Sequence, residues 1–315
     1  MTKLTRTETA AFFRDNDRFA IVTHRRPDGD TLGSAAVLCR GLRQLGKTAH
    51  ILENPDITAK YAHLTHGLSK DAPGEGDTLV CVDVAARKML PQRYEDLFIA
   101  LRIDHHGTAE SFTDRELVDA GSAACGEIVY DVLKLLGVTL DVPMAQALYT
   151  AVSTDTGCFR YANTTANTLR VAADCLQAGA DTFALNQVLF ETNSLGRLRL
   201  QGWLVENALF MQERQIAICA LPKHIEQELG LTEDDLENIS GFPRTIEGVK
   251  IAATIRQDTA DTVKVSVRAV PGYDAAAICA HFGGGGHKGA AGCSMKMPME
   301  QAVLALQAVM PTIHR

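Results

Sequence analysis

FAIVTHRRPDGDTLGSAAVLCRGLRQLG, residues 19–46, is the stretch that decides the fold. Its first five residues form an apolar run that predicts a buried strand, and residues 32–45 then show the apolar spacing of a helix that ends at Gly46. Further strands are predicted at residues 49–52, 78–82 and 97–103, and further helices at 123–136, 143–152 and 165–178. Because strands and helices alternate, we expect an α/β fold with a mainly parallel sheet and helices on both faces.

A different pattern begins near residue 200. Further strands are predicted at residues 216–220, 249–255 and 263–267, and helices at 274–282 and 299–310. A chain of 315 residues also exceeds the usual size of one domain. We therefore expect a first domain at residues 1–190, a helical connector at 191–205, and a smaller α/β domain at 206–315.

The composition excludes several classes of protein. A formal net charge of −7 argues against a protein that coats long nucleic acid, although a short anionic substrate in a local cationic site remains compatible with it. The eight cysteines form no C-x-x-C pair and are expected to be reduced thiols. No stretch reaches the roughly 18 apolar residues of a membrane span, and the first residues lack the apolar core of a signal peptide. We expect a cytoplasmic protein that does not bind membranes.

Acidic and imidazole side chains follow the first strand. His24, Asp28 and Asp30 lie directly after it, and ligand sites in α/β sheets form outside the carboxyl ends of strands. Pro27 and Gly29 fix the turn, so that alternate side chains can point to one place. An ordinary Asp-Gly turn with a surface histidine is the alternative for this motif alone.

Later strands end in the same residue types. Asp83 follows residues 78–82, and Asp104-His105-His106 follows the strand that ends at residue 103. A buried carboxylate cluster would suffer desolvation and mutual repulsion, and divalent metals remove that cost. Asp155 supplies one more carboxylate, unless it only caps a helix or forms a turn.

This mixture of ligands indicates the metal and the chemistry. Carboxylates with neutral imidazoles suit Mn²⁺ or a similar octahedral ion better than zinc, which prefers thiolates. Two such ions about 4 Å apart can supply a hydroxide nucleophile and stabilise charge on a phosphoryl group, provided that a carboxylate bridges them. The sequence therefore predicts hydrolysis of a phosphate ester.

A glycine run, GGGGHKGAAG at residues 283–292, forms a second candidate site. It fits neither a dinucleotide fingerprint, because no helix follows it, nor a Walker A loop, because Gly-Lys-Ser/Thr is absent. We interpret it as backbone that approaches a ligand closely, with His287 at the anionic part of that ligand. A tight helix-to-strand turn packed on the other domain is the alternative. Arg160 and Arg268 are cationic candidates for phosphate, although Arg268 could equally pair with a surface carboxylate.

Together these segments resemble the DHH phosphoesterase family, which is named after the triplet at 104–106. Its motifs are matched in order by HRRPDGD at 24–30, VDVA around Asp83, DHH at 104–106, TDTGCFRY at 154–161 and GGGGHKGAAG at 283–292. The last of these resembles the signature of the DHH-associated C-terminal domain. The resemblance implies a metal-binding catalytic first domain, a substrate-binding second domain, and an active site in the cleft between them.

The resemblance also implies a set of site residues. One Mn²⁺ would be held by His24, Asp28 and Asp83, and the other by Asp30, Asp83, His105 and Asp155. Asp83 would be the bridging carboxylate and His106 would lie near the substrate phosphate, while Asp104 would support the histidines. A terminal phosphate of the substrate would be bound by Arg268, Gly285, Gly286 and His287, with Arg160 as a further candidate.

Within the family, the chain resembles the compact nanoRNase/pAp-phosphatase group. Family II pyrophosphatases lack the glycine–histidine signature, RecJ-type exonucleases carry further domains, and membrane-bound cyclic-di-AMP phosphodiesterases carry membrane segments. The resemblance implies an enzyme that uses two Mn²⁺, or Mg²⁺ or Co²⁺, to cleave RNA of 2–5 nucleotides. It would also remove the 3′-phosphate of adenosine 3′,5′-bisphosphate (pAp).

Two alternatives remain at this point. One is a stand-alone phosphodiesterase for cyclic-di-AMP or pApA, and the other is a non-catalytic nucleotide-binding regulator. The regulator predicts a broken ligand set, whereas all six candidate ligands are present. Apolar helix faces make a homodimer an additional expectation.

Overall fold

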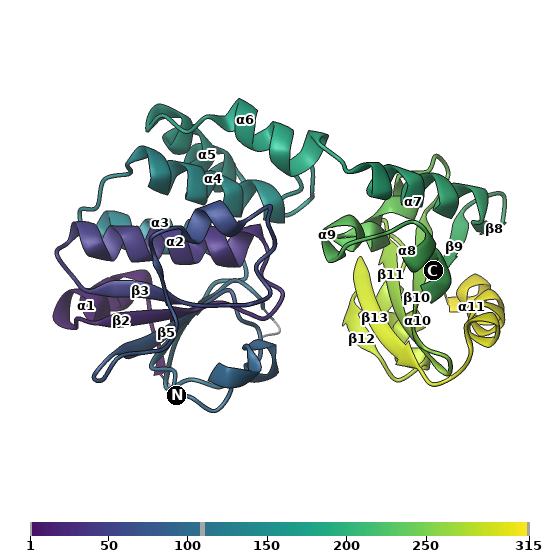
Figure 1. Cartoon of the computed structure of the whole chain (residues 1–315), viewed down its shortest axis with the longest axis horizontal. Coiled ribbons are helices and arrows are strands. Elements are labelled where there is room, and N and C mark those ends of the chain that lie inside the picture. Colours follow the sequence, from purple (N-terminus) through teal and green to yellow (C-terminus); the bar gives the residue numbers. More distant parts are fainter. Residues whose placement is uncertain (1, 108–110, 314–315) are drawn as a thin grey trace. The chain divides into compact units, whose positions relative to one another are not determined.

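The computed structural model describes residues 2–107 and 111–313 of the chain. The chain divides into two compact units, Met1–Thr192 and Asn193–Arg315, and each is described here by itself (Figure 1). The predicted domain bounds and connector stay predictions.

Unit 1 is built on a seven-stranded sheet in the order β1-β7-β6-β5-β2-β3-β4, with every neighbouring pair parallel. The strands are β1 (Thr2–Lys3), β2 (Phe19–Val22), β3 (Ala49–Leu52), β4 (Ser69–Lys70), β5 (Thr78–Val82), β6 (Leu101–Asp104) and β7 (Arg115–Val118). Strands β2 and β5 are largely apolar and buried, as expected of a parallel sheet that is covered on both faces, and β6 is buried although it carries Arg102 and Asp104.

Helices of unit 1 lie mainly on one face of this sheet. The α-helices are α1 (Arg6–Asp15), α2 (Gly29–Gln44), α3 (Cys125–Leu135), α4 (Val142–Asp155), α5 (Ala166–Gln177) and α6 (Thr182–Asn186), followed by a π-helix, η4 (Gln187–Glu191). Figure 1 shows α2 and α3 along the sheet, with α4 and α5 farther from it. Their apolar side chains form one core with alternate strand residues such as Phe19 and Ile21.

The opposite face of the sheet is covered by the segment that follows β5. Ala20 and Val22 of β2 pack there against Leu90 and Tyr94. This region contains the short 3₁₀ helices η2 (Arg87–Met89) and η3 (Gln92–Tyr94), and another, η1 (Ala62–Thr65), precedes β4. The sequence predicted helices on both faces of the sheet, and on this face the described residues after β5 form only short 3₁₀ helices.

Unit 2 contains a six-stranded mixed sheet in the order β12-β13-β11-β10-β9-β8. Its strands are β8 (Leu209–Met211), β9 (Ile216–Leu221), β10 (Ile251–Thr259), β11 (Thr262–Ala269), β12 (Gly285–His287) and β13 (Ala290–Met295). Its helices are α7 (Leu195–Glu206), α8 (Lys223–Glu228), α9 (Glu233–Leu236), the 3₁₀ helix η5 (Ile239–Thr245), α10 (Ala275–His281) and α11 (Met299–Ile313). One core lies between the sheet and α10–α11, and a second packs Leu200 and Leu204 of α7 against β9.

The predicted α/β fold class, with a mainly parallel first sheet and a smaller second domain, is confirmed. All eight cysteines are free thiols. None of the helices in the described part of the chain has the length and apolar character needed to cross a bilayer.

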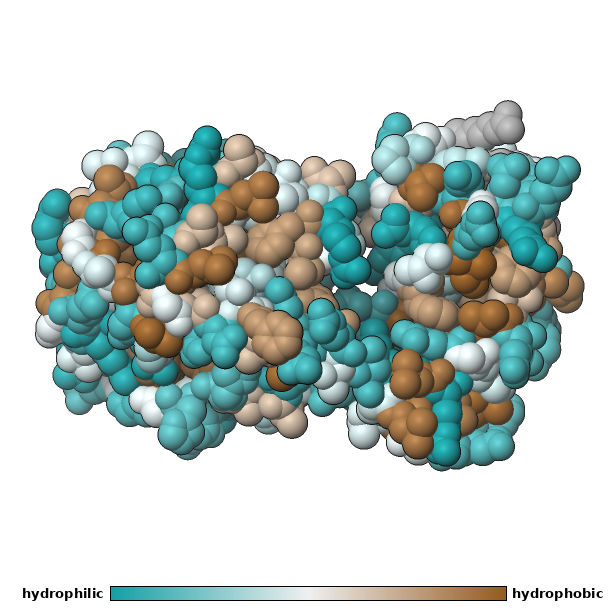
Figure 2. All heavy atoms as spheres, turned by 90° about the horizontal axis from the view of Figure 1, so that it is seen from above, coloured by the Kyte–Doolittle hydropathy of each residue, from teal (hydrophilic) through white to brown (hydrophobic). Residues whose placement is uncertain are grey.

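Some apolar side chains of unit 1 are exposed. Figure 2 looks down on the helices at the top of Figure 1 and shows such side chains scattered among hydrophilic ones. They include Leu169 and Leu176 of α5, Phe183 of α6 and Val188 of η4. The predicted homodimer stays a prediction.

Candidate metal centre

Three neighbouring strands bring the predicted ligands of unit 1 to one edge of the sheet. In the order β6-β5-β2 these strands are parallel, so their carboxyl ends meet at the same edge. His24 follows β2, Asp83 follows β5, and Asp104-His105-His106 ends and follows β6. This is the edge at which ligand sites form in open α/β sheets.

The start of α2 directs two carboxylates to different places. Asp28 caps the helix, and its Oδ1 accepts hydrogen bonds from the amides of Asp30 and Thr31, each at 3.1 Å. Asp30 lies one step into the helix and accepts from the amides of Cys125 at 2.6 Å and Gly126 at 3.0 Å, at the start of α3. These bonds hold both carboxylates in fixed directions.

Gly29, between these two residues, allows α4 to come close. A Cβ at this position would lie 2.5 Å from Oγ1 of Thr154. Thr154 immediately precedes Asp155, the last residue of α4. The glycine that the sequence identifies as a turn former therefore also permits the helix contact that brings Asp155 to the site.

Asp83 has an unusual backbone conformation. Its φ is +57°, in the left-handed region that costs a non-glycine residue energy but is tolerated best by Asp and Asn. Its amide donates to the carbonyl of Ile103 at 2.9 Å, which fixes the residue between β5 and β6. Its buried Oδ1 accepts no hydrogen bond from the residues that the structure describes.

A first group of ligand atoms consists of His24, Asp28 and Asp83. Nε2 of His24 lies 3.7 Å from Oδ1 of Asp28 and 3.8 Å from Oδ2 of Asp83. Ligand atoms of all three residues lie within 4.8 Å of one another. Two ligands at about 2.1 Å from one ion are roughly 3–3.5 Å apart, so these separations suit a shared cation better than direct hydrogen bonds.

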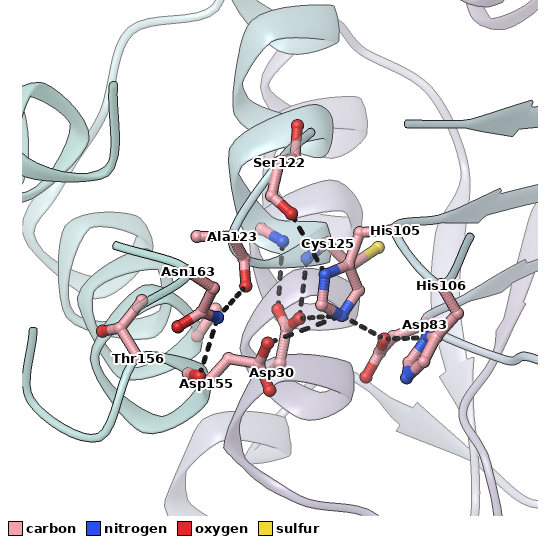
Figure 3. A network of polar contacts seen from close by, with 12 residues as sticks. Asp30, Asp83, His105, His106, Ser122, Ala123, Cys125, Asp155, Thr156 and Asn163 are labelled. Carbon is pink, nitrogen blue, oxygen red and sulfur yellow. Dashed lines mark hydrogen bonds and ion pairs between the residues drawn. The ribbon is translucent and has the colours of Figure 1, made fainter. Parts of the chain in front are cut away.

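A second group surrounds the ring of His105 (Figure 3). Its Nε2 lies 3.5 Å from Oδ2 of Asp155, 3.5 Å from Oδ1 of Asp83 and 3.8 Å from Oδ2 of Asp30. Asp83 thus presents one oxygen to each group. The structure brings together all six predicted metal ligands.

Each of the three histidines has its Nδ1 next to an acceptor. Nδ1 of His24 lies 2.9 Å from the carbonyl of Arg25, and Nδ1 of His105 lies 3.2 Å from the carbonyl of Ser122. A proton on Nδ1 leaves the lone pair of Nε2 facing the carboxylates, as a metal-binding histidine requires. These carbonyls assign the tautomers.

His106 is oriented by Asp104. Oδ1 of Asp104 lies 2.8 Å from the ring Nδ1 of His106 and also accepts from the amides of His105 and His106. Asp104 is fully buried, and the buried Arg102 lies 3.7 Å from its other oxygen. The ring of His106 is more exposed than that of His105, so its Nε2 is available to a substrate.

The carboxylates destabilise one another's charged forms. Burial and the charge of Asp155 raise the pKa of Asp30 to about 7, and burial raises the pKa of Asp155 to about 6. Burial, with the charges of Asp30 and Asp28, raises the pKa of Asp83 well above its ordinary value. A divalent cation would offset both the burial and the repulsion, and it would give the orphaned oxygen of Asp83 a partner. The donor set therefore fits the predicted cations.

The predicted phosphate ligands of unit 2 lie on one sheet. Arg268 on β11 and His287 on β12 both pair with Ala290 of β13, one from each side. Residues paired directly across strands point to the same face, so both side chains share that face with only Ala290 between them. Gly285 and Gly286 belong to β12, and a Cβ at Gly285 would meet open space.

Arg160 lies in unit 1, in the turn after α4. Its Nε donates to the carbonyl of Gly157 at 2.6 Å, which fixes an exposed side chain close to Asp155 in the sequence. The left-handed conformations of Cys158 and Phe159 shape this turn.

Several supporting residues lack a sequence motif. Asn54 donates to Oγ1 of Thr23 at 3.0 Å and to the carbonyl of His24 at 2.8 Å, which ties the loop after β3 to the metal motif. Asn163 donates to the carbonyl of Asp155 at 3.1 Å. The only signal for Asn54 is its place before Pro55 at a strand end, and Asn163 has none.

Comparison with known proteins agrees with this geometry. Residues 18–152 match the DHH family, N-terminal domain, and residues 215–312 match the DHHA1 domain. A bifunctional oligoribonuclease and PAP phosphatase NrnA from Thermus thermophilus is 34% identical over 90% of this chain and 86% of that protein. The chain belongs to the DHH family. The predicted family is confirmed, and with it the prediction of a hydrolase that acts on phosphoester bonds.

Other relatives extend the comparison. The protein of the same name from Bacillus subtilis is 25% identical over 89% of this chain and 90% of that protein. A crystal structure of an exopolyphosphatase-related protein from Bacteroides fragilis superposes with a TM-score of 0.82 and 24% identity, covering 97% of this chain and 95% of that one. The last similarity supports the fold alone.

Proposed function

We propose that this DHH-family protein is a Mn²⁺-dependent phosphoesterase that hydrolyses short oligoribonucleotides to mononucleotides and removes the 3′-phosphate of pAp. Its relatives named oligoribonuclease and PAP phosphatase cover nearly the whole chain, which supports this substrate class. The substrates would be RNA of 2–5 nucleotides, pApA and pAp.

A single observation carries the two-metal part of the proposal. Asp83 directs Oδ2 towards Nε2 of His24 and Oδ1 towards Nε2 of His105, so its two oxygens face the two groups. Its ligand atoms lie close to those of His24 and Asp28, and also to those of His105 and His106. Such a shared carboxylate is what two closely spaced cations require. His24, Asp28 and Asp83 would hold one Mn²⁺, and the second would be held by Asp30, Asp83, His105 and Asp155. When bound, the two ions would supply an activated water and stabilise the charge that develops on phosphorus.

His106 would act on the substrate directly. Its Nδ1 is committed to Asp104, so Nε2 is the nitrogen that would donate to an oxygen of the scissile phosphate. Burial alone would raise the pKa of Asp104, but its hydrogen bonds with His106 hold that pKa below its usual range, so the carboxylate stays charged beside the ring.

Unit 2 would bind the far end of the substrate. Arg268 and His287 share one face of its sheet, and the open space over Gly285 leaves room for a phosphate to approach the backbone. A terminal phosphate held there would favour short substrates without a basic surface, as the net charge of −7 requires. Arg160 is a further candidate for substrate contact from unit 1.

The test uses purified protein with Mn²⁺, and with Mg²⁺ or Co²⁺ for comparison. Hydrolysis of pApA, a trinucleotide, pAp and cyclic-di-AMP is followed by chromatography. The proposal predicts mononucleotides from pApA and release of phosphate from pAp. Inactivity on all four substrates contradicts it, and turnover confined to cyclic-di-AMP assigns the chain to the alternative phosphodiesterase. The cytoplasmic location stays a prediction.

A further inference from the structure

A pocket lies beside the first group of ligand residues in unit 1. It has a volume of about 520 Å³ and is lined by Arg25, Pro55, Asp56, Pro91, Gln92 and Arg93. This volume lies within the range of roughly 300–1,000 Å³ that small-molecule sites occupy. Neither the predicted metal ligands nor the predicted phosphate ligands contribute to its lining.

The walls of the pocket belong to the same sheet edge as the metal ligands. Arg25 directly follows His24 after β2, and the other lining residues come from the loops after β3 and β5. The amide of Arg25 donates to the carbonyl of Met89 at 2.7 Å, which joins the first and last of these loops. Asn54 joins the middle loop to the carbonyl of His24. These hydrogen bonds therefore hold the pocket next to His24, one of the candidate metal ligands.

The charged side chains of the lining differ in how they are held. Arg93 lies 3.2 Å from Asp71, also donates to the carbonyl of Glu53, and stacks over the ring of Tyr94. Asp56 accepts from the amide of Arg26 at 3.2 Å. By contrast, the described residues provide no hydrogen bond or ion pair for the side chain of Arg25, although it is exposed beside a buried ligand cluster.

The two proposed substrates differ on one side of the reacting phosphate. Both pAp and pApA carry a phosphate on the 3′ oxygen of a nucleotide that ends in a 5′-phosphate. In pApA that phosphate is also esterified to the 5′ oxygen of a second adenosine, whereas in pAp it is not. If the same 3′ bond breaks in both substrates, the second adenosine needs a place beside the metal ligands that pAp leaves empty.

We propose that this pocket holds the nucleoside that pApA has and pAp lacks. The exposed ring of Pro55 offers apolar surface to a base or ribose, and Arg25 and Gln92 offer polar groups to its edges or to the following phosphate. Arg25 thereby selects for oligonucleotides over pAp. The inference rests on the proposed function, because it takes pAp and short RNA as substrates of one centre.

The test compares Arg25→Ala with the wild-type protein on pApA and on pAp. We expect KM for pApA to rise about ten-fold, as for loss of a hydrogen bond from a charged group, while kcat and KM for pAp stay within about two-fold. Gln92→Ala should also raise KM for pApA, by a smaller factor, and leave the kinetics with pAp unchanged. Arg170→Ala removes an exposed arginine on α5, outside the pocket, and serves as the matched control.

The outcomes separate this inference from the proposed function. A wild-type protein that cleaves neither substrate contradicts the proposed function itself. If the wild type cleaves both but Arg25→Ala weakens both equally, Arg25 contacts the shared part of the substrates and the pocket assignment is wrong. An Arg25→Ala variant that matches Arg170→Ala on both substrates also overturns it. Thermal unfolding of each variant checks that the exposed substitutions leave the fold intact.

Discussion

The substitution Asp83→Asn is expected to abolish activity and yet stabilise the protein when divalent cations are removed. Asn tolerates the left-handed conformation of Asp83, where φ is +57°, so the change removes charge without adding the strain that Ala would bring. The carboxylate is buried among Asp30, Asp28 and Asp155, and burial and these charges raise its pKa. An amide in its place ends that repulsion, and its NH₂ group can donate to the neighbouring carboxylates.

The size of the effect follows from the environment of this side chain. Oδ1 is buried without a hydrogen bond from the described residues, and such a group costs about 1–3 kcal/mol. Relief of that cost should raise Tm by roughly 2–10 °C for a unit of this size. With Mn²⁺ the wild type should have the higher Tm. Binding at 100 times Kd stabilises the wild type by about 2.7 kcal/mol, whereas the variant lacks the carboxylate that both groups of ligands share. Turnover should fall about 10³-fold or more, since two-metal stabilisation contributes several kcal/mol.

The assay is a pair of thermal unfolding series, one with chelator and one with increasing Mn²⁺, run beside turnover of pApA. Plots of Tm against Mn²⁺ concentration for the two proteins should cross, because the variant is more stable with chelator and the wild type is more stable with Mn²⁺. A variant with a lower Tm than the wild type in chelator would show that the carboxylate of Asp83 does not destabilise the folded protein. A variant that keeps both its Mn²⁺ stabilisation and its turnover would refute the bridging role.

Four further predictions follow from the geometry. Burial raises the pKa of Asp30 to about 7 and of Asp155 to about 6. In chelator, their stabilising contribution is therefore full below about pH 4 and is lost as pH rises to about 7. In calorimetry, Mn²⁺ affinity should correspondingly rise between about pH 5 and pH 7.5, because binding displaces these protons. Asp104→Asn, which replaces the acceptor of the His106 ring, should lower kcat roughly 10–100-fold while Mn²⁺-induced stabilisation remains. Arg268→Ala should raise KM about ten-fold for pApA but leave ApA, which lacks the 5′-phosphate, nearly unchanged in steady-state kinetics. Gly33→Ala, whose Cβ would lie 2.4 Å from the carbonyl of Ala147, should lower the free energy of unfolding by about 1–3 kcal/mol in chemical denaturation.

Much of unit 1 could be predicted because its signals are local. The apolar run at β2 and the helical spacing after it place both elements within a few residues of their observed bounds. The parallel sheet then brings the residues after β2, β5 and β6 to one edge, so the cluster of His24, Asp83 and His105 follows from strand order. The short strands β1 and β7 pair with each other although they are far apart in sequence, and no local sequence pattern predicts either strand.

The conformation of the ligands could not be predicted in the same way. The left-handed backbone of Asp83 depends on the hydrogen bond from its amide to Ile103, which exists only once β5 and β6 are paired. The tautomers of His24 and His105 depend on carbonyls that the tertiary structure places beside them. Strand β12 was not predicted, because its glycines have low strand propensity and only the pairing with β13 overrides that propensity.

The position of Asp155 depends on two glycines, Gly29 and Gly33, that are not themselves metal ligands. It is the last residue of α4, so it reaches His105 only if that helix lies close to α2. Gly29 and Gly33 permit this approach, because a Cβ at either position would lie within 2.5 Å of an α4 oxygen. A larger side chain there would push Asp155 away from His105 and weaken the second group of ligands without changing any ligand. Gly29 of the first DHH motif and Gly33 farther along α2 therefore help to determine whether the protein can hold a second cation. Mn²⁺ titration of Gly33→Ala should show one site weakened more than the other.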